Sequence, residues 1–408
     1  MKILHTSDWH LGKTIENRNR IDEQAQFIEF LSDMVKAENV DLVLIAGDIF
    51  DTYNPSAAAE RLFYHALSSI GENGKRVVLV IAGNHDNPER LCAANPLANH
   101  NNIILLGYPG STAQAGSCVT ASGPGWLELH LASCGQNAVV LTMPYPSEMR
   151  LEEVLFDEQD EKAQQKQFTQ KIGAVYESLT DKFRDDTVNL AIGHYLVMGG
   201  EESDSERTIS IGGALSIHPD ALPNKAQYIA LGHLHRPQRV KGVSVPVIYC
   251  GSPLAYSFSE SEHAKAVYLV TVNPGENALV SECYLTCGKP LRRWTAKNGF
   301  QEVLQWCREG RDIDAWVDLE IFTDKVLTKE ELDTLRQLHS GILNIRPRFL
   351  TEKTESIEWV DRENKKIDVL FNEYYQYRTG IQASEDVMAA FVELMNDDNP
   401  DETGGIDT

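Results

Sequence analysis

Paired cysteines are missing from this sequence of 408 residues. Its seven cysteines are scattered and include no CxxC pair, which argues against a disulfide framework or a structural zinc site. An apolar run long enough to span a bilayer is also missing, as is a leader of the secretory kind. We therefore expect a cytoplasmic protein with reduced thiols and no membrane contact.

Basic side chains are scarce as well, because 37 Lys and Arg stand against 60 Asp and Glu and give a formal net charge of -23. Affinity for nucleic acid normally rests on basic residues that neutralise phosphates, so this charge argues against a general polyanion binder. Part of the acidic excess is local, in residues 152–161 and in a tail from 379 onwards without Lys or Arg. A P-loop or Rossmann glycine motif is not evident, so we do not expect this chain itself to hydrolyse ATP.

What the sequence does contain is one repeated pattern, an apolar run that ends in glycine and then in Asp, Asn or His. Such uninterrupted runs predict strands that are covered on both faces. The early runs are separated by segments of helical periodicity, which gives βαβ order and predicts a layered α/β fold. The runs are VDLVLIAGD (40–48), RVVLVIAGNHD (76–86), VNLAIGHY (188–195) and QYIALGHLH (227–235), and KILHTSDWH fits without the glycine.

Polar side chains at the carboxyl ends of such strands are expected to meet in one crevice. Asp8 and His10, at strand spacing, should point to the same side. Two carboxylates, one amide and four imidazoles are too many for one ion but suit two, with Asp48 between them. Mixed nitrogen and oxygen ligands favour Mn²⁺, Fe²⁺ or Zn²⁺ over Mg²⁺ or Ca²⁺. The candidate metal ligands are Asp8, His10, Asp48, Asn84, His194, His233 and His235.

His85 lies beside the candidate ligand Asn84, and we expect its side chain to project toward a substrate. The ordinary pKa range of histidine suits a general acid, although a residue that only orients the loop would have the same position. Asp51 and Asp86 are more typical of residues that support a ligand or a turn. The remaining histidines lack a strand-end context and are interpreted as structural or surface residues.

The runs DWH, GDIFD, GNHD, GHY and GHLH resemble the five motifs of the calcineurin-like metallophosphoesterases. The longer strings HTSDWHLGK, AGDIFDT, AGNHD, YIALGHLHRPQ and YCGSPLAYSFSE narrow the resemblance to the SbcD family, the nuclease subunits of SbcCD complexes. The resemblance implies an α/β fold, a four-layer metallophosphoesterase β-sandwich flanked by helices, with a small α+β capping domain and C-terminal helices.

The same resemblance implies a function. It implies a Mn²⁺-dependent 3′ to 5′ exonuclease on duplex DNA ends and an endonuclease on single strands and hairpins, in DNA repair, recombination and replication near the nucleoid. His85 matches the catalytic histidine. The implied ligand sets are Asp8, His10, Asp48 and His235 for one metal ion and Asp48, Asn84, His194 and His233 for the other. Every expected ligand is present, which argues against an inactive relative.

The domain limits that we expect are a nuclease domain at 1–285, an α+β capping domain at 286–360, a helical segment at 361–396 and a disordered acidic tail at 397–408. Stripes in the helical segment usually face a chain's own core. Because the family ends in helices that grip a coiled-coil ATPase, we interpret them as a surface for an SbcC-like partner. The stripe residues are Leu370, Phe371, Tyr374, Phe391 and Leu394.

Two further surfaces are less specific. Lys13, Arg18 and Arg20 follow the first ligands and could contact DNA phosphates, although a solvated loop has the same composition. The family also implies a homodimer within a heterotetramer, and residues 57–70 could contribute to it or pack on the sheet. A phosphoesterase acting on a phosphodiester or phosphomonoester other than DNA, and a non-catalytic scaffold for an ATPase, remain as alternative functions.

Overall fold

The computed structural model describes residues 1–151, 161–206, 216–349, 367–379, 382–384 and 387–391. The chain divides into two compact units, Met1–Leu291 and Arg292–Thr408. No helix in the described residues is both long and apolar enough to cross a membrane.

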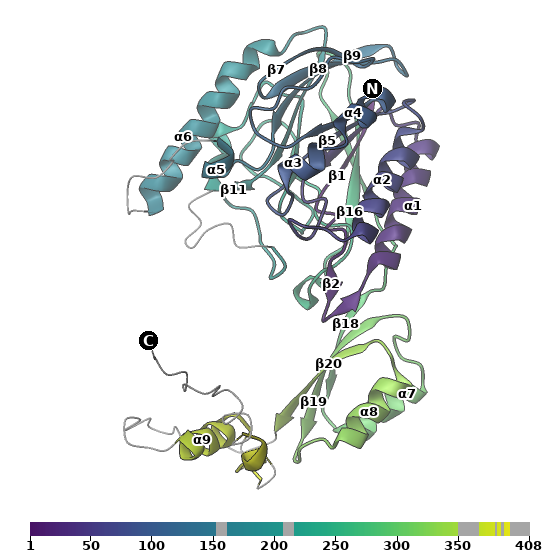
Figure 1. The fold of residues 1–408 in the computed structure, drawn as a ribbon, viewed down its shortest axis with the longest axis vertical. Coiled ribbons are helices and arrows are strands. Elements are labelled where there is room, and N and C mark those ends of the chain that lie inside the picture. Colours follow the sequence, from purple (N-terminus) through teal and green to yellow (C-terminus); the bar gives the residue numbers. More distant parts are fainter. Residues whose placement is uncertain (152–160, 207–215, 350–366, 380–381, 385–386, 392–408) are drawn as a thin grey trace, which may run out of the picture. The chain divides into compact units, whose positions relative to one another are not determined.

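The first unit is built on two β-sheets (Figure 1). The first sheet has six strands, in the spatial order β17 (Leu279–Tyr284), β16 (Ala266–Thr271), β1 (Lys2–Thr6), β4 (Leu42–Ala46), β5 (Val77–Ile81) and β6 (Ile103–Leu106). Strands β1, β4, β5 and β6 are parallel, β16 pairs antiparallel with β1, and β17 pairs antiparallel with β16. Helix α1 (Ile21–Ala37) lies between β1 and β4, and α2 (Ala57–Gly71) lies between β4 and β5. This is the predicted βαβ order.

The second sheet has seven strands. Its centre is parallel, because β10 pairs with both β9 and β13 in parallel and β13 pairs with β15 in the same way. Helix α6 (Glu161–Leu179) precedes β10 in the chain. The spatial order is β14 (Gln238–Arg239), β15 (Val247–Tyr249), β13 (Tyr228–Gly232), β10 (Val188–His194), β9 (Gln136–Met143), β8 (Trp126–Leu131) and β7 (Val119–Gly123).

The two sheets pack face to face between layers of helices, as Figure 1 shows with α1 and α2 on one side and α6 on the other. Strand β10 illustrates why, since alternate residues point to opposite faces of a sheet. Its Leu190 and Ile192 belong to the core shared with the first sheet, whereas Ala191 packs in the core that holds Phe168 and Ile172 of α6. The order helix, sheet, sheet, helix confirms the predicted four-layer sandwich.

Short elements fill the connections of the first unit. They are β2 (Thr14–Ile15), β3 (Arg18–Asn19), α3 (Pro88–Cys92), α4 (Asn95–Ala98), α5 (Glu148–Leu151), β11 (Leu196–Val197) and β12 (Ser216–Ile217).

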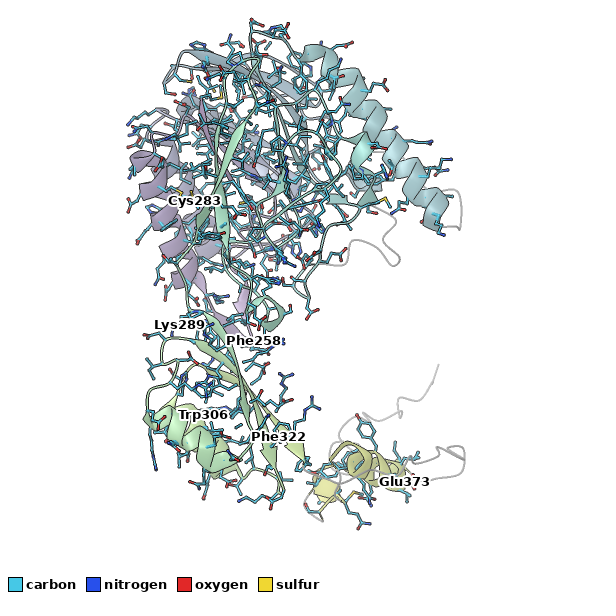
Figure 2. The ribbon with its side chains drawn as sticks, turned by 180° about the vertical axis from the view of Figure 1, so that it is seen from behind. Phe258, Cys283, Lys289, Trp306, Phe322 and Glu373 are labelled. Carbon is cyan, nitrogen blue, oxygen red and sulfur yellow. The ribbon has the colours of Figure 1, made fainter. Side chains whose placement is uncertain are left out.

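The second unit contains a three-stranded sheet of β18 (Leu291–Ala296), β19 (Trp316–Thr323) and β20 (Ile342–Phe349). Helices α7 (Phe300–Arg308) and α8 (Lys329–Leu338) supply Val303 and Leu335 to its core. Figure 2 shows Trp306 on α7 and Phe322 on β19. Helix α9 (Ile367–Thr379) follows, and residues 387–391 are helical as well.

Candidate metal centre

The structure brings all seven predicted ligands together from the carboxyl ends of five strands in both sheets. Asp8 and His10 follow β1, Asp48 follows β4 and Asn84 follows β5. From the second sheet, His194 is the last residue of β10, and His233 and His235 follow β13. All but Asn84 are buried.

Four of these ligands have a left-handed backbone conformation. The φ angles are 52° for Asp8, 45° for His10, 50° for Asp48 and 109° for His233. Such a conformation costs a residue other than glycine about 1–3 kcal/mol and tends to occur at functional sites. The expected strand spacing of Asp8 and His10 is wrong, since β1 ends at Thr6 and each ligand is presented by a turn of the chain.

Glycine precedes the ligands because the two sheets come very close together here. A Cβ atom on Gly232 would lie 1.9 Å from the carbonyl oxygen of Ala46, which belongs to the other sheet. A Cβ atom on Gly83 would lie 2.1 Å from a carboxylate oxygen of Asp48. The repeated glycine of the sequence pattern therefore allows the ligand-bearing loops to approach one another.

The first group of ligands surrounds His10. The Nε2 atoms of His10 and His235 lie 3.0 Å apart, and His10 Nε2 lies 3.6 Å from Asp48 Oδ2. Asp8, His10 and His235 each bring one ligand atom to a position within 4.8 Å of the other two. Two ligands at about 2.1 Å from one ion and at a right angle are about 3 Å apart, so this spacing suits a shared cation.

The second group surrounds Asn84. Its Oδ1 lies 2.9 Å from His194 Nε2 and 3.2 Å from His233 Nδ1. His194 Nε2 also lies 3.5 Å from Asp48 Oδ2. The same oxygen of Asp48 therefore faces both groups, which is the position of a bridging carboxylate.

The tautomer of His194 shows that a cation fits this group. His194 Nδ1 lies 2.8 Å from the carbonyl oxygen of Ala46, and because a carbonyl can only accept, Nδ1 carries the proton. In the neutral ring, Nε2 then presents a lone pair to oxygens of Asp48 and Asn84. Converging acceptor atoms in a buried site require a positive charge between them.

Electrostatics in the metal-free protein agree with this requirement. Burial raises the pKa of Asp8 to about 6 and lowers the pKa of His233 to about 3. Burial alone would lower the pKa of His194, but the charges of Asp48 and Asp8, together with hydrogen bonds to Asp48 and to the carbonyl oxygen of Ala46, outweigh it and raise that pKa to about 9. Burial opposes ionisation of Asp48 too, yet His194 holds its pKa well below the usual range. In the metal-free protein, a proton on His194 thus supplies the positive charge that a metal ion would supply when bound.

His85 lies at the edge of both groups. Its ring centroid is 4.7 Å from that of His10, and its Nδ1 donates to the carbonyl oxygen of Asp51 at 2.7 Å. Its backbone N–H donates to Asp48 Oδ1 at 2.9 Å. Nε2 makes no hydrogen bond to any residue of the described ranges, so it is available to a substrate.

Asp86 and Arg150 support the loop that carries Asn84 and His85. The Asp86 carboxylate accepts hydrogen bonds from the backbone of Ile49, Phe50 and Gly83. Arg150, on α5, donates to the carbonyl oxygens of Gly83 at 2.7 Å and Asp86 at 2.6 Å. Asp86 was expected in a supporting role. Sequence reasoning missed Arg150, because nothing in the string SEMRL indicates that its side chain reaches the other sheet.

The three basic residues near the first ligands have different surroundings. Arg18 is exposed, and Lys13 forms an ion pair of 3.0 Å with Asp51. Arg20 is only 1% exposed and is paired with Glu23 at 2.7 Å. This burial contradicts the predicted DNA contact of Arg20. The charge of Arg20 is used in an ion pair inside the first unit, and we no longer count it among the DNA contacts.

The predicted partner stripe is described in part. Leu370 and Phe371 are half-buried, and Tyr374 is 51% exposed. The rings of Phe371 and Phe391 stack with centroids 3.9 Å apart. Leu394 and the tail at 397–408 lie outside the described residues.

Residues 57–70 form most of α2, whose Phe63 and Leu67 pack into the core of the first unit. The helix thus packs on the sheet, which was one of the two alternatives expected from the sequence. Its outer surface borders a groove of about 490 Å³, where Tyr64 is 43% exposed and Leu97 of α4 is 76% exposed.

Comparison with known proteins defines the class. Residues 1–237 match the model of the calcineurin-like phosphoesterases, and the chain therefore belongs to that family. Within it, this chain is 45% identical to SbcD, the D component of the SbcCD nuclease of Bacillus subtilis (strain 168), over 395 residues, which cover 97% of each chain. The predicted resemblance is confirmed.

A dimetal phosphatase of known structure from Danio rerio is 13% identical, with a TM-score of 0.37, and the match covers 69% of this chain and 98% of that one. The family implies divalent metal ions, and the groups at Asp8, His10 and His235 and at Asp8, Asp48 and His194 fit them.

Proposed function

We propose that this chain is the nuclease subunit of an SbcCD-type complex, a Mn²⁺-dependent 3′ to 5′ exonuclease on duplex DNA ends and an endonuclease on single strands and hairpins. The observation that carries this proposal is the position of Asp48 Oδ2, 3.6 Å from His10 Nε2 and 3.5 Å from His194 Nε2, in a chain 45% identical to a nuclease subunit. Such a bridging carboxylate supports a site for two ions.

Two bound divalent cations would supply the Lewis acidity that activates a water molecule and neutralises charge on a phosphodiester. The first ion would be held by Asp8, His10, Asp48 and His235, and the second by Asp48, Asn84, His194 and His233. Both groups contain imidazole and oxygen donors, which suits Mn²⁺.

His85 would move the proton in this reaction. Because its Nδ1 donates to the carbonyl oxygen of Asp51, a second proton can only be held at Nε2. From there it can pass to the departing 3′ oxygen, so His85 would serve as the general acid. The carbonyl oxygen of Asp51 would hold this ring in place, and the backbone hydrogen bonds that Asp86 accepts would hold the loop that carries it.

We place the chain with its DNA substrate in the cytoplasm, in the nucleoid. Its partner would be an SbcC-like coiled-coil ATPase that binds Leu370, Phe371, Tyr374, Phe391 and Leu394. The α+β unit that begins at Arg292 would correspond to the capping domain that the family resemblance implies. Lys13 and Arg18 are the basic residues that we retain as DNA contacts.

A homodimer within a heterotetramer would use the groove beside α2. Exposed apolar side chains such as Tyr64 and Leu97 are common at subunit contacts, since their burial removes apolar surface from water.

The test of this function is digestion of an end-labelled DNA duplex with Mn²⁺, with a chromogenic phosphodiester as a second substrate. Wild-type protein should shorten the strand from its 3′ end, and His85→Ala should slow this by about 10²- to 10⁴-fold, because the general acid is lost. The matched control is His130→Ala, since His130 is exposed on β8.

Cleavage of the chromogenic ester without any cleavage of DNA, even with a coiled-coil ATPase added, would favour the alternative, a metallophosphoesterase with another substrate. Unchanged activity of His85→Ala on both substrates would contradict the role of this histidine.

A further inference from the structure

A buried ion pair lies behind the first group of ligands and has no part in the proposed reaction. Glu260 is fully buried and Lys265 is 8% exposed, and their charged groups form an ion pair. Glu260 ends the string YCGSPLAYSFSE. A buried ion pair often contributes little to stability, because both charges lose their hydration. The contacts of this ion pair indicate instead that it helps to position His235.

Ser205 connects the ion pair to His235. Its Oγ lies 2.5 Å from Glu260 Oε1 and 2.5 Å from His235 Nδ1. An ammonium group can only donate, and the carboxylate that it holds can only accept. The hydroxyl of Ser205 therefore donates to Glu260 and accepts from His235 Nδ1–H.

This direction of hydrogen bonds fixes the tautomer of His235. With its proton on Nδ1, the ring presents the lone pair of Nε2 toward His10 Nε2, 3.0 Å away. The opposite tautomer would place N–H where a cation has to bind, and it would leave the short contact between Ser205 Oγ and His235 Nδ1 without a proton, because the Ser205 proton is given to Glu260.

The backbone of His235 is held by charged groups as well. Its N–H donates to Glu206 Oε1 at 2.7 Å, and its carbonyl oxygen accepts from Lys265 Nζ at 2.8 Å. The carbonyl also accepts from the N–H of Ser252 at 3.2 Å. Both the ring and the main chain of His235 are thus held by hydrogen bonds on the side away from the candidate metal position.

We propose that Lys265, Glu260 and Ser205 form a positioning relay that fixes the tautomer and orientation of His235 and thereby sets the affinity of the first metal position. The inference rests on the proposed two-metal function. None of the three side chains is proposed to touch DNA. Supporting hydrogen bonds of this kind change metal affinity by about 10- to 100-fold.

The experiment is a titration of the metal-free full-length protein with Mn²⁺ alone, in which the signal of free Mn²⁺ is followed by electron paramagnetic resonance. Wild-type protein should bind two ions. Ser205→Ala should weaken one of the two binding steps by about 10-fold or more and leave the other unchanged, because it breaks the relay without removing the ion pair.

Three variants make the result specific. Ser205→Thr keeps a hydroxyl and should restore wild-type binding. Glu260→Gln removes the negative charge and should weaken the same binding step as Ser205→Ala. The control is Glu262→Gln, since Glu262 is exposed two residues away and should have no effect. The melting temperature of metal-free Ser205→Ala should equal that of wild type, which separates positioning from a structural role.

The outcomes distinguish the two proposals. Wild-type protein that binds fewer than two ions would overturn the two-metal function and the relay with it. Two normal binding steps in both Ser205→Ala and Glu260→Gln would overturn the relay alone. Equal weakening of both steps, or failure of Ser205→Thr to restore binding, would also overturn it, because the effect would not act through the hydroxyl and His235.

Discussion

At the scale of single residues, the buried carboxylates of Asp8 and Asp48 determine what the site needs. Both lie in the interior, and in the metal-free protein the nearest compensating charge is a proton on His194, whose pKa is raised to about 9. A divalent cation and the proton on His194 can therefore each supply the positive charge that these carboxylates need. A divalent ion has to displace the proton before Nε2 of His194 can become a ligand.

The first prediction concerns this exchange. Below a pH of about 9 His194 is protonated without metal, so Mn²⁺ binding at pH 7.5 should release about one proton from it. Calorimetric titration in two buffers of different ionisation enthalpy measures the number. His194→Gln cannot release this proton and serves as the comparison. Equal proton release by wild type and His194→Gln would contradict the prediction.

A second prediction concerns Arg150. Arg150→Met removes both hydrogen bonds to the carbonyl oxygens of Gly83 and Asp86, which bracket Asn84 and His85. We expect kcat to fall by about 10- to 100-fold with little change in KM, since support of a ligand is lost and no substrate contact is removed. Steady-state kinetics with the chromogenic phosphodiester measures both constants.

Arg184→Met is the control for this variant, because Arg184 forms exposed ion pairs with Glu128 and Asp186. A rise in KM at constant kcat would show that Arg150 contacts substrate instead.

At the scale of elements, the sheets were predictable and the turns that follow them were not. Apolar runs such as 40–48 and 188–195 have no polar face, and only a strand covered on both sides accommodates them. The turns at Asp8 and His10 depend on hydrogen bonds from Asp8 N–H to Gly47 and from His10 N–H to Asp48, which involve the neighbouring strand's loop. A local pattern cannot encode such long-range contacts.

The supporting residues were unpredictable for the same reason. Arg150 and Glu260 lie far from the ligand motifs in sequence and act across the fold. Lys13 and Arg20 are both basic and lie seven residues apart, yet Lys13 is half-buried and Arg20 lies in the interior. Their partners differ, since Lys13 pairs with Asp51 and Arg20 pairs with Glu23.

A third prediction belongs to α2 and α4. Leu97→Glu places a charge at the most exposed apolar side chain of the groove, so a dimer that buries this surface should dissociate. Light scattering after gel filtration should give twice 45.6 kDa for wild type and 45.6 kDa for the variant. Leu279→Glu, at a similarly exposed leucine on β17, should remain dimeric. A dimeric Leu97→Glu variant would exclude this groove as the contact.

At the scale of the whole molecule, charge is the property that most limits function. A net charge of -23 repels a DNA backbone, while the basic residues retained as DNA contacts, Lys13 and Arg18, are few. The attraction of metal ions acts only on the phosphate at the site. Strong binding of long DNA therefore needs surface from another protein.

The fourth prediction follows from this charge. The chain alone should bind duplex DNA with a Kd of about 10⁻⁶ M or weaker, and an SbcC-like ATPase should tighten binding by at least about 10-fold. Tyr374→Glu should abolish the gain from the ATPase, because Tyr374 is exposed on α9, without changing binding by the chain alone. Fluorescence anisotropy of labelled DNA at constant salt measures both.

Leu279→Glu again provides the comparison at an exposed apolar residue outside α9. Nanomolar binding of DNA by the isolated chain, or an undiminished effect of the ATPase on Tyr374→Glu, would contradict the prediction.

The spread of the ligands along the chain has a consequence for the cell. The first ligand is residue 8 and the last is residue 235, and the two lie in different sheets. A growing chain on the ribosome cannot complete the site until more than half of its length has been made and both sheets have paired. A chain that ends before residue 235 lacks at least one candidate ligand and cannot form the complete site, so an unfinished nuclease would not cut DNA.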